Sequence, residues 1–430
     1  MSAIGGRSCQ FAFVNQKESP VKYPGTLVLR GSLSILATFS AIPRKTRMII
    51  YSLVFLNIAV GYIIVVLVAY LPELNVSSSA VGLLLGLGGI VASVGSIPLG
   101  VLSDKRGRKV ILVLSSLVVA PAVIAFAFTT NLLYLSISVI VYSIGEAGTL
   151  ATWNAIIADQ TTLENRDAAF SLSFIVTTGS FAVGSLLPFF FPLIQHLTGL
   201  GSVAVHRDFV IIVGILALAT PAWLGFLLRD YAETPTERKF ARGRNFPRLL
   251  KFSGINSLIG LGAGFIIPLV PTWLFLKFGI LDTYTGPLLA VSNITIALAA
   301  VVSPRLSTKY GLVSAIVLTQ GLSTIFMLSL AFIPSAGLAA GLYIIRAALM
   351  NMSAPLSDSY LMGITTQEER GFASSVNSVM WRLPNSATTI IGGMILQTGR
   401  YDLPFYLATG FYVGSIFLFY VNFRKISPQK

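Results

Sequence analysis

The sequence predicts an all-α membrane protein with twelve transmembrane helices in two pseudo-symmetric six-helix bundles. Hydrophobic residues make up 54% of the 430 residues and charged residues only 11%, against about 25% charged in ordinary soluble domains. A soluble particle could not cover so much apolar surface, so the chain requires lipid around it, and only helix bundles and closed β-barrels span lipid. Barrel strands alternate apolar and polar residues, whereas Met48 to Leu71 is an unbroken apolar run, which leaves the helix bundle.

Twelve stretches are long enough to cross about 30 Å of hydrocarbon at about 1.5 Å per residue. Of the 30 Lys and Arg residues, 25 lie before the first stretch, in or at the edges of the loops after even-numbered stretches, or after the last stretch, while three lie in the other loops. Positive loops stay inside, so both termini are predicted to be cytoplasmic. This topology accounts for the net charge of +14 without a nucleic-acid partner. The stretches are Met48 to Leu71, Ser79 to Leu102, Val110 to Thr129, Leu132 to Ile157, Ala168 to Ile194, Phe209 to Leu228, Leu249 to Leu276, Thr285 to Leu306, Leu312 to Ile333, Gly337 to Tyr360, Gly371 to Gln397, and Leu403 to Phe423.

A degraded internal repeat predicts the two bundles. Gly100 to Gly107 reappears as Pro304 to Gly311, and the run Glu164 to Arg166 reappears as Glu368 to Arg370, both at an offset of 204 positions. Paired halves of this kind are typical of transporters, whose substrate site lies between them. The predicted organisation is a cytoplasmic extension (1–47), a first bundle (48–228), a cytoplasmic linker (229–248), a second bundle (249–423) and a cytoplasmic tail (424–430).

The loop between the second and third stretches carries a motif. Residues Gly100 to Lys109 read G-x-L-x-D-K-x-G-R-K, which resembles the signature between helices 2 and 3 of the major facilitator superfamily. Together with the twelve stretches and the second copy of the loop, the resemblance covers residues 48–425. It implies a transporter that works by alternating access, and not an enzyme.

The resemblance also implies a cytoplasmic gate at Gly100, Asp104, Gly107 and Arg108. In that family the carboxylate and the arginine of this loop latch the cytoplasmic side when the protein faces outward. A carboxylate is favoured near the positive N-terminal end of a partner helix, here expected to be helix 11, and a glycine can adopt turn geometry closed to other residues. The alternative is that the basic residues of the loop only orient the protein.

Three ionisable side chains lie at membrane depth in the predicted helices, Glu146, Arg346 and Arg382. Such residues are costly in lipid and indicate function. For Arg382 we expect a structural salt bridge with Asp358, which lies nearer the cytoplasmic end of helix 10.

Helix 4 carries a face of larger side chains. Tyr142, Glu146, Thr149 and Trp153 follow one another at spacings of 4, 3 and 4, which places them on one side of a helix. The repeat offset makes Arg346 the counterpart of Tyr142, and in the superfamily helices 1, 4, 7 and 10 line the central cavity. We therefore expect Glu146 and Arg346 to face one another across a cavity, with Asn57 of helix 1 as a further polar group; the alternative is that each charge pairs within its own half.

Glu146 is the predicted proton-coupling residue. Apolar surroundings disfavour the ionised carboxylate and a nearby arginine favours it, so such a group can bind and release a proton. The run Gly145 to Gly148 is similar to helix 4 of the spinster-like and organic-anion branches of the superfamily. Those branches carry an arginine where this chain has Val139, so the subfamily stays open.

The predicted function is secondary active transport of a small amphipathic or anionic organic solute across the plasma membrane, with proton-coupled efflux favoured. The alternatives are a proton-coupled uptake symporter for an organic anion or sugar derivative, and a non-transporting membrane sensor on the same scaffold. No G-x-x-x-x-G-K-[ST] phosphate loop occurs, and no cofactor is expected. With the single cysteine Cys9 and the two histidines His196 and His206, no metal site is expected either.

Overall fold

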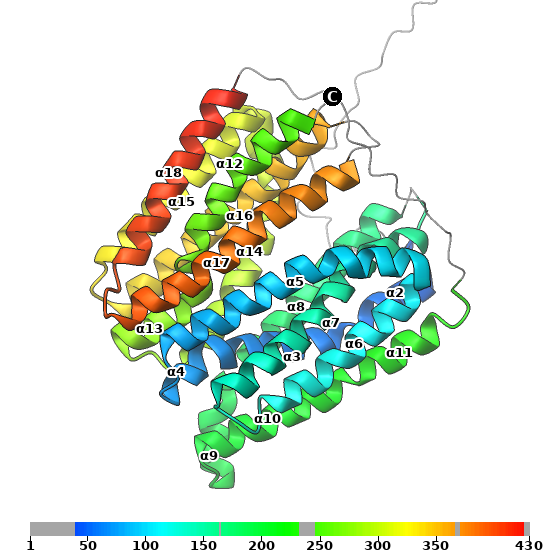
Figure 1. The fold of residues 1–430 in the computed structure, drawn as a ribbon, viewed down its shortest axis with the longest axis vertical. Helices are drawn as coiled ribbons and strands as arrows, with labels where there is room; N and C mark the ends of the chain where they lie inside the picture. The colour runs from blue at the N-terminus through cyan, green and yellow to red at the C-terminus, as the bar shows by residue number, and fades with distance from the viewer. Residues whose placement is uncertain (1–38, 163–164, 232–245, 366–369, 425–430) are drawn as a thin grey trace, which may run out of the picture. The chain divides into compact units, whose positions relative to one another are not determined.

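The computed structural model describes residues 39–162, 165–231, 246–365 and 370–424, and the regular elements of this part are helices (Figure 1). The chain divides into two units, Met1–Ala41 and Ile42–Lys430. Every helix named below belongs to the second unit. Most of the predicted extension, linker and tail lies outside the described residues.

The first half of the helical unit runs from α2 to α11. Its first span is interrupted by a π-helical turn and its fifth by a 3-10 turn. The elements are α2 (Arg44–Tyr51), α3 (Val54–Val65), η1 (Val66–Tyr70), α4 (Leu71–Glu73), α5 (Ser78–Arg106), α6 (Arg108–Ala125), α7 (Leu132–Asp159), α8 (Arg166–Leu186), η2 (Leu187–Phe190), α9 (Phe191–Thr198), α10 (Ser202–Ala217) and α11 (Ala219–Leu227).

The second half begins at α12. Its elements are α12 (Phe246–Gly264), η3 (Ile267–Leu269), α13 (Val270–Phe278), α14 (Asp282–Tyr310), α15 (Leu312–Phe332), α16 (Ala336–Ile364), α17 (Arg370–Gln397) and α18 (Leu403–Phe423).

Among the described residues, ten helical stretches are long and apolar enough to cross a membrane, or eleven when the bent α14 counts as one span. The 45° bend of α14 precedes Pro304, whose ring lacks a backbone donor and crowds the carbonyl four residues earlier. The 28-residue α17 is the predicted stretch that falls outside this set. Its sequence is less apolar than that of the other spans, and its polar side chains bind neighbouring helices. Asn385 donates to the Gly260 carbonyl (3.2 Å) and Thr388 to the Leu261 carbonyl (2.8 Å).

The predicted repeat is visible in the helix boundaries. Helices α5 and α14 begin at Ser78 and Asp282, and both pairs α7/α16 and α8/α17 likewise begin 204 positions apart. The backbone between the helices repeats as well: Gly107 and Gly311 have φ of 105° and 81°. A side chain would strain this conformation, so glycine at both positions is explained by the turn that the sequence predicts.

The loops lie at two opposite ends of the helical unit, which we call the linker end and the far end. The linker end carries residues 107, 160, 229 and 311, and the far end carries residues 74–77, 126–131, 199–201, 279–281, 333–335 and 398–402. Figure 1 shows α5 and α17 side by side near α4 and α13, at the far end, and diverging toward the opposite end.

Close packing joins the two halves at the far end. Ser78 donates its hydroxyl to the Gly393 carbonyl (3.1 Å) and its backbone N–H to Gln397 (3.0 Å). A Cβ on Gly82 would lie 2.9 Å from the Cα of Gly393, so these helices touch backbone to backbone. Small residues permit such contacts between membrane helices.

A further contact at the far end joins equivalent positions of the repeat. Thr272 of α13 donates its hydroxyl to the backbone carbonyl of Val68 (2.6 Å), and these residues are 204 positions apart. Val68 lies in the π-helical turn η1, whose wider winding changes the normal carbonyl pairing. The two halves therefore meet close to the axis that relates them.

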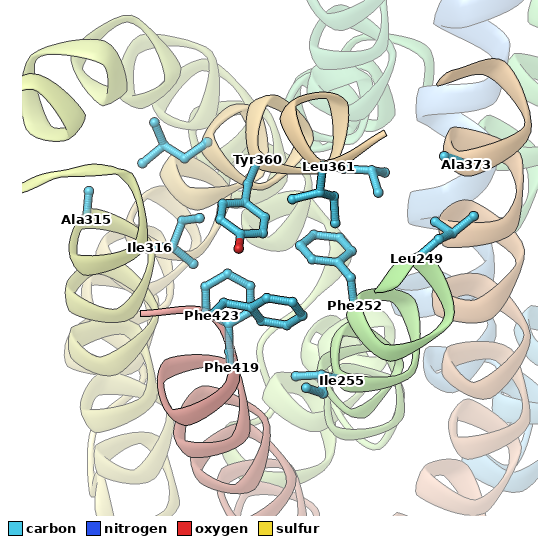
Figure 2. Packing of buried hydrophobic residues seen from close by; sticks show 12 residues of the cluster. Leu249, Phe252, Ile255, Ala315, Ile316, Tyr360, Leu361, Ala373, Phe419 and Phe423 are labelled. Carbon is cyan, nitrogen blue, oxygen red and sulfur yellow. The ribbon is translucent and has the colours of Figure 1, made fainter. Parts of the chain in front are cut away.

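At the linker end the second half has a core of its own. Aromatic rings of α12, α16 and α18 pack together there, and Figure 2 shows them pointing toward one another. Phe252 and Tyr360 have ring centres 5.8 Å apart, and Phe419 and Phe423 have ring centres 5.1 Å apart. This packing holds the linker ends of three helices in one body.

Candidate functional site

A cavity of about 440 Å³ lies in the first half and is lined mainly by α3, α7 and α8. Its wall includes Asn57, Tyr142, Glu146 and Trp153, four residues that the sequence places in the candidate site. Most of the remaining lining is apolar. The predicted face of helix 4 therefore does border a cavity.

The orientation of α7 follows from its small residues. A Cβ on Gly145 would lie 2.6 Å from a Val119 methyl and 2.7 Å from the Ser115 carbonyl, and Gly148 lies against Ser115 as well. These glycines let the back of α7 lie directly on α6, which turns Glu146 on the opposite side toward the cavity.

Neighbouring hydrogen bonds hold the cavity side chains in place. The Trp153 indole donates to the Ser173 hydroxyl (2.9 Å), a bond that joins α7 to α8. Asn57 donates to the Leu53 carbonyl of its own helix (2.9 Å). The aromatic wall is therefore fixed, while Tyr142 and Glu146 supply the polar groups beside it.

The charge opposite Glu146 comes from Arg382, not from Arg346. Glu146 Oε1 lies 4.0 Å from Arg382 Nη1, and the two side chains keep 39% and 42% exposure because they border open space inside the bundle. The residues belong to α7 and α17, so this ion pair joins the two halves. The expected salt bridge between Arg382 and Asp358 is wrong: Asp358 is exposed, and no ion pair joins the two in the described part of the chain.

Arg346 is buried inside the second half. Its side chain is 3% exposed and donates from Nη2 to the Tyr412 hydroxyl (2.8 Å), with the guanidinium carbon 5.8 Å from the Tyr412 ring centre. Ser323 of α15 donates to the Arg346 backbone carbonyl (3.0 Å). The expectation that Arg346 faces Glu146 is therefore wrong, because this side of α16 is turned toward α15 and α18. Of the two possibilities considered for Arg346, pairing within its own half is the one observed.

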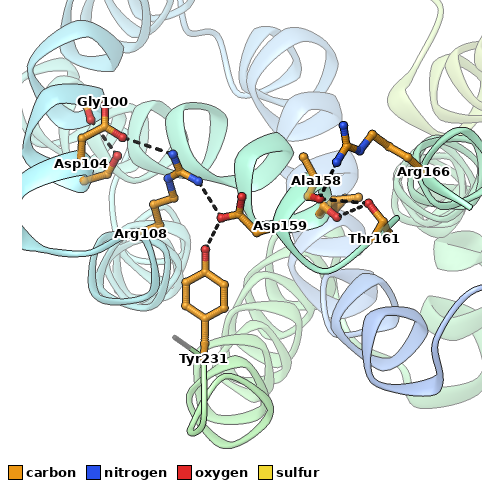
Figure 3. Close-up of polar contacts among 10 residues, drawn as sticks. Gly100, Asp104, Arg108, Ala158, Asp159, Thr161, Arg166 and Tyr231 are labelled. Carbon is orange, nitrogen blue, oxygen red and sulfur yellow. Dashed lines mark hydrogen bonds and ion pairs between the residues drawn. The ribbon is translucent and has the colours of Figure 1, made fainter. Parts of the chain in front are cut away.

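The predicted gate residues meet at the linker end of the first half (Figure 3). Arg108 donates from Nη1 to Asp159 Oδ2 (2.6 Å), and its Nη2 lies 3.6 Å from Asp104 Oδ1. Gly107 makes the turn that starts α6, and the carbonyl of Gly100 accepts a hydrogen bond from Ser103 (2.7 Å). Arg108 thus lies between two carboxylates of the same half.

Two members of this cluster do not follow from the loop motif. Asp159 ends α7, and Tyr231, which follows α11, donates its hydroxyl to Asp159. Burial, together with the hydrogen bond to Asp159 and its negative charge, raises the pKa of Tyr231, so the hydroxyl keeps its proton and acts as the donor. A carboxylate just past the end of a predicted span was the available signal for Asp159.

Within the described residues, no group of three or more His, Cys, Asp and Glu side chains is arranged to hold a metal ion. The chemistry that this arrangement allows is binding of a solute beside a carboxylate, and making or breaking an ion pair between the halves.

Comparisons with known proteins agree with this architecture. The family model of the Major Facilitator Superfamily matches twice, over residues 48–253 and 252–430. Multidrug resistance protein 1 of Bacillus subtilis (strain 168) is 25% identical over 370 residues, which cover 82% of this chain and 89% of that protein.

Solved structures share the fold at low sequence identity. A single-residue mutant of the nucleoside transporter NupG has a TM-score of 0.71 at 14% identity, over 88% of this chain and 99% of that one. A bacterial homologue of the human lysosomal transporter Spinster, in an inward-facing and unoccupied conformation, has a TM-score of 0.66 at 16% identity, over 90% and 96%. A peptide transporter of the POT family has a TM-score of 0.71 at 13% identity, over 90% and 99%.

Proposed function

Since the chain belongs to the major facilitator superfamily, whose members are membrane transporters of small solutes and not enzymes, we propose that it exports amphipathic organic solutes by proton-coupled alternating access. The proposal places the protein in the plasma membrane with both termini in the cytoplasm and with twelve spans, of which α17 is the eleventh along the chain. The similarity to a multidrug resistance protein of Bacillus subtilis supports efflux over uptake.

The observation that carries the proposal is the Glu146–Arg382 pair at the edge of an apolar cavity. Aromatic and aliphatic side chains provide area for an amphipathic solute, and the carboxylate provides one charged contact. An anionic solute is less well supported than the sequence indicates, because Arg346 is buried away from this cavity.

The same pair offers a route to coupling. Glu146 and Arg382 belong to different halves, so a proton on Glu146 removes the attraction that connects them. A cationic group of a solute would compete with Arg382 for the same carboxylate. Proton binding and solute binding would then act on the same contact between the halves. Each would change the affinity for the other, and this coupling is what proton-driven transport requires.

The gate residues would complete the cycle at the linker end. The far end is packed shut by α5 and α17, and Arg108 here pairs within its own half. When the far end opens, the linker ends approach, and Asp104 comes within reach of the positive N-terminal end of α17. We propose that this contact latches the linker end.

Flux in proteoliposomes tests the proposal. A fluorescent amphipathic dye should accumulate when a pH gradient is imposed, and Glu146→Gln should still bind the dye but lose gradient-driven transport, since an amide hydrogen-bonds but does not titrate. Exchange of dye without net proton movement should persist in this variant. Ser329→Ala is the control, because Ser329 lies on α15 outside the cavity lining and its hydroxyl donates to the Ile325 carbonyl of its own helix.

Each outcome distinguishes one alternative. Unaltered proton-driven flux in Glu146→Gln would remove Glu146 as the coupling residue. Flux in the same direction as proton flow would identify an uptake symporter, and dye binding without any flux would identify a sensor.

A further inference from the structure

A buried ion pair at the far end connects the two halves. Nε2 of His206, on α10, lies 2.7 Å from Oδ2 of Asp282, the first residue of α14, and each side chain is 4% exposed. The cavity, the gate and the Glu146–Arg382 pair do not involve either residue. Two ionisable groups this deeply buried require a specific arrangement of partners.

The other ring nitrogen fixes the proton count of this pair. Nδ1 of His206 lies 2.9 Å from the backbone carbonyl of Ser202. The Ser202 hydroxyl lies farther away, 3.3 Å from Nδ1. The nearer partner is the carbonyl, which only accepts hydrogen bonds, so Nδ1 donates to it and carries a hydrogen. The short contact to Asp282 needs a second hydrogen, held either by Nε2 beside a carboxylate or by the carboxyl beside a neutral ring. Both descriptions contain the same number of protons, one more than a neutral histidine beside an ionised aspartate.

We infer that the His206–Asp282 pair is a proton-binding site whose bound proton holds the far ends of the two halves together. Without that proton the ring has one hydrogen for two acceptors, so either the Asp282 contact or the Ser202 carbonyl contact loses its hydrogen, and the closed pair is weakened. The inference rests on the proposed function only in that the far end must open during alternating access; it does not depend on Glu146.

The surroundings of the pair include a second carboxylate and a cavity of about 250 Å³ that His206 borders with Tyr70 and Arg207. Glu73 of α4 accepts a hydrogen bond from the Asp282 backbone N–H (2.6 Å), which adds another contact between the halves. Three aromatic side chains contact His206: Tyr70 is stacked on the imidazole with ring centres 3.5 Å apart, Phe191 is edge-on to the ring, and Tyr62 donates to the His206 carbonyl. Two cationic side chains of these elements have other partners. Arg207 pairs with Asp208 in solvent, and Lys277 donates to the Ala331 carbonyl.

Closure and proton binding are therefore linked. The proton bridges the two residues only while the far end is closed, because opening separates the halves that carry them. For a single linked proton, the ratio of open to closed molecules should rise about tenfold per pH unit through the titrating range.

Distances between spin labels across the far end test this linkage. The full chain carries Cys9→Ala, with cysteines introduced at Thr130, which is exposed before α7, and at Gly337 in the first turn of α16, where an added Cβ meets nothing within 4 Å. Without any solute, raising the pH should shift the population from the short to the long distance.

Two variants isolate the pair. In Asp282→Asn the amide can donate to Nε2 while Nδ1 still donates to Ser202, so both contacts form without the additional proton. We expect this variant to stay closed at every pH, whereas His206→Ala should favour the long distance at every pH. The control is His196→Gln, which changes the exposed histidine of α9. Its spin-label distances should depend on pH in the same way as those of the unmodified protein.

The inference is overturned if the distances do not depend on pH in the labelled protein with His206 and Asp282 intact, or if Asp282→Asn keeps the same pH dependence. Unchanged distances in His206→Ala would also overturn it. Failure of the proposed coupling residue is separable: if Glu146→Gln transports normally while the distances still follow pH, the proton site at the far end stands and the proposed role of Glu146 does not.

Discussion

The contact between α5 and α17 can be perturbed by one methyl group. In Gly82→Ala the new Cβ would lie 2.8 Å from the Thr389 carbonyl oxygen and 2.9 Å from the Cα of Gly393. Both neighbours are backbone atoms in helices, so neither can rotate away as a side chain would. The two helices must move apart for the alanine to fit.

The magnitude follows from the cost of overpacking. An additional carbon in a well-packed interior costs about 1–3 kcal/mol. This cost applies to the state in which the far end is closed, because the helices are separated when it is open. The ratio of open to closed molecules should therefore rise about 5- to 150-fold.

The spin-label pair at Thr130 and Gly337 measures that ratio. The matched control is Gly179→Ala in the interior of α8, where an added Cβ meets nothing within 4 Å. It makes the same chemical change, with the same gain in helix propensity, and should leave the distances unchanged. Equal distance distributions for the two variants would refute the conclusion that the far end is held shut by direct backbone contact.

Three other predictions follow from the buried charge, the gate and the topology. Tyr412→Phe should lower the free energy of unfolding by about 1–3 kcal/mol, because it leaves a buried donor of Arg346 without its partner; an unchanged denaturation midpoint in detergent would contradict this. Asp104→Asn should weaken the state with a closed linker end, seen as faster thiol labelling of linker-side positions, and normal labelling together with normal transport would exclude a latch. A cysteine at Asn131 should react with an impermeant reagent outside intact cells and one at Tyr310 should not; the reverse pattern would invert the predicted orientation.

Much of the helical architecture was predictable because a span of lipid requires a long apolar run. The predicted stretch Ser79 to Leu102 corresponds to α5 at Ser78–Arg106, and the predicted Leu403 to Phe423 coincides with α18. The 204-position repeat was predictable from two short loops, because turns such as the one at Gly107 tolerate few residues. The polar α17 shows the limit of this reasoning, since a helix covered by protein on two sides does not have to be as apolar as one in lipid.

The residues that share the cavity face of α7 were predictable from the sequence, but the partners of the charged side chains were not. Spacing alone placed Tyr142, Glu146 and Trp153 on one face, and that face does line a cavity. The partner of each charge depends on how neighbouring helices are rotated, which no local pattern records. Arg346 is bound by Tyr412, which is 66 positions later in the chain, and Arg382 lies beside a glutamate of the other half.

The repeat offset shows how far the two halves have diverged in charge. The counterpart of Glu146 in the second half is Met350, and the counterpart of Arg382 in the first half is Thr178. A dimer of two identical chains would present the glutamate–arginine contact twice, once on each side of its axis. In this single chain the contact occurs once, and a thioether and a hydroxyl occupy the equivalent positions. The interface between the halves is therefore asymmetric in charge, and an asymmetric interface can favour one orientation of a polar molecule, which a strictly symmetric one could not do.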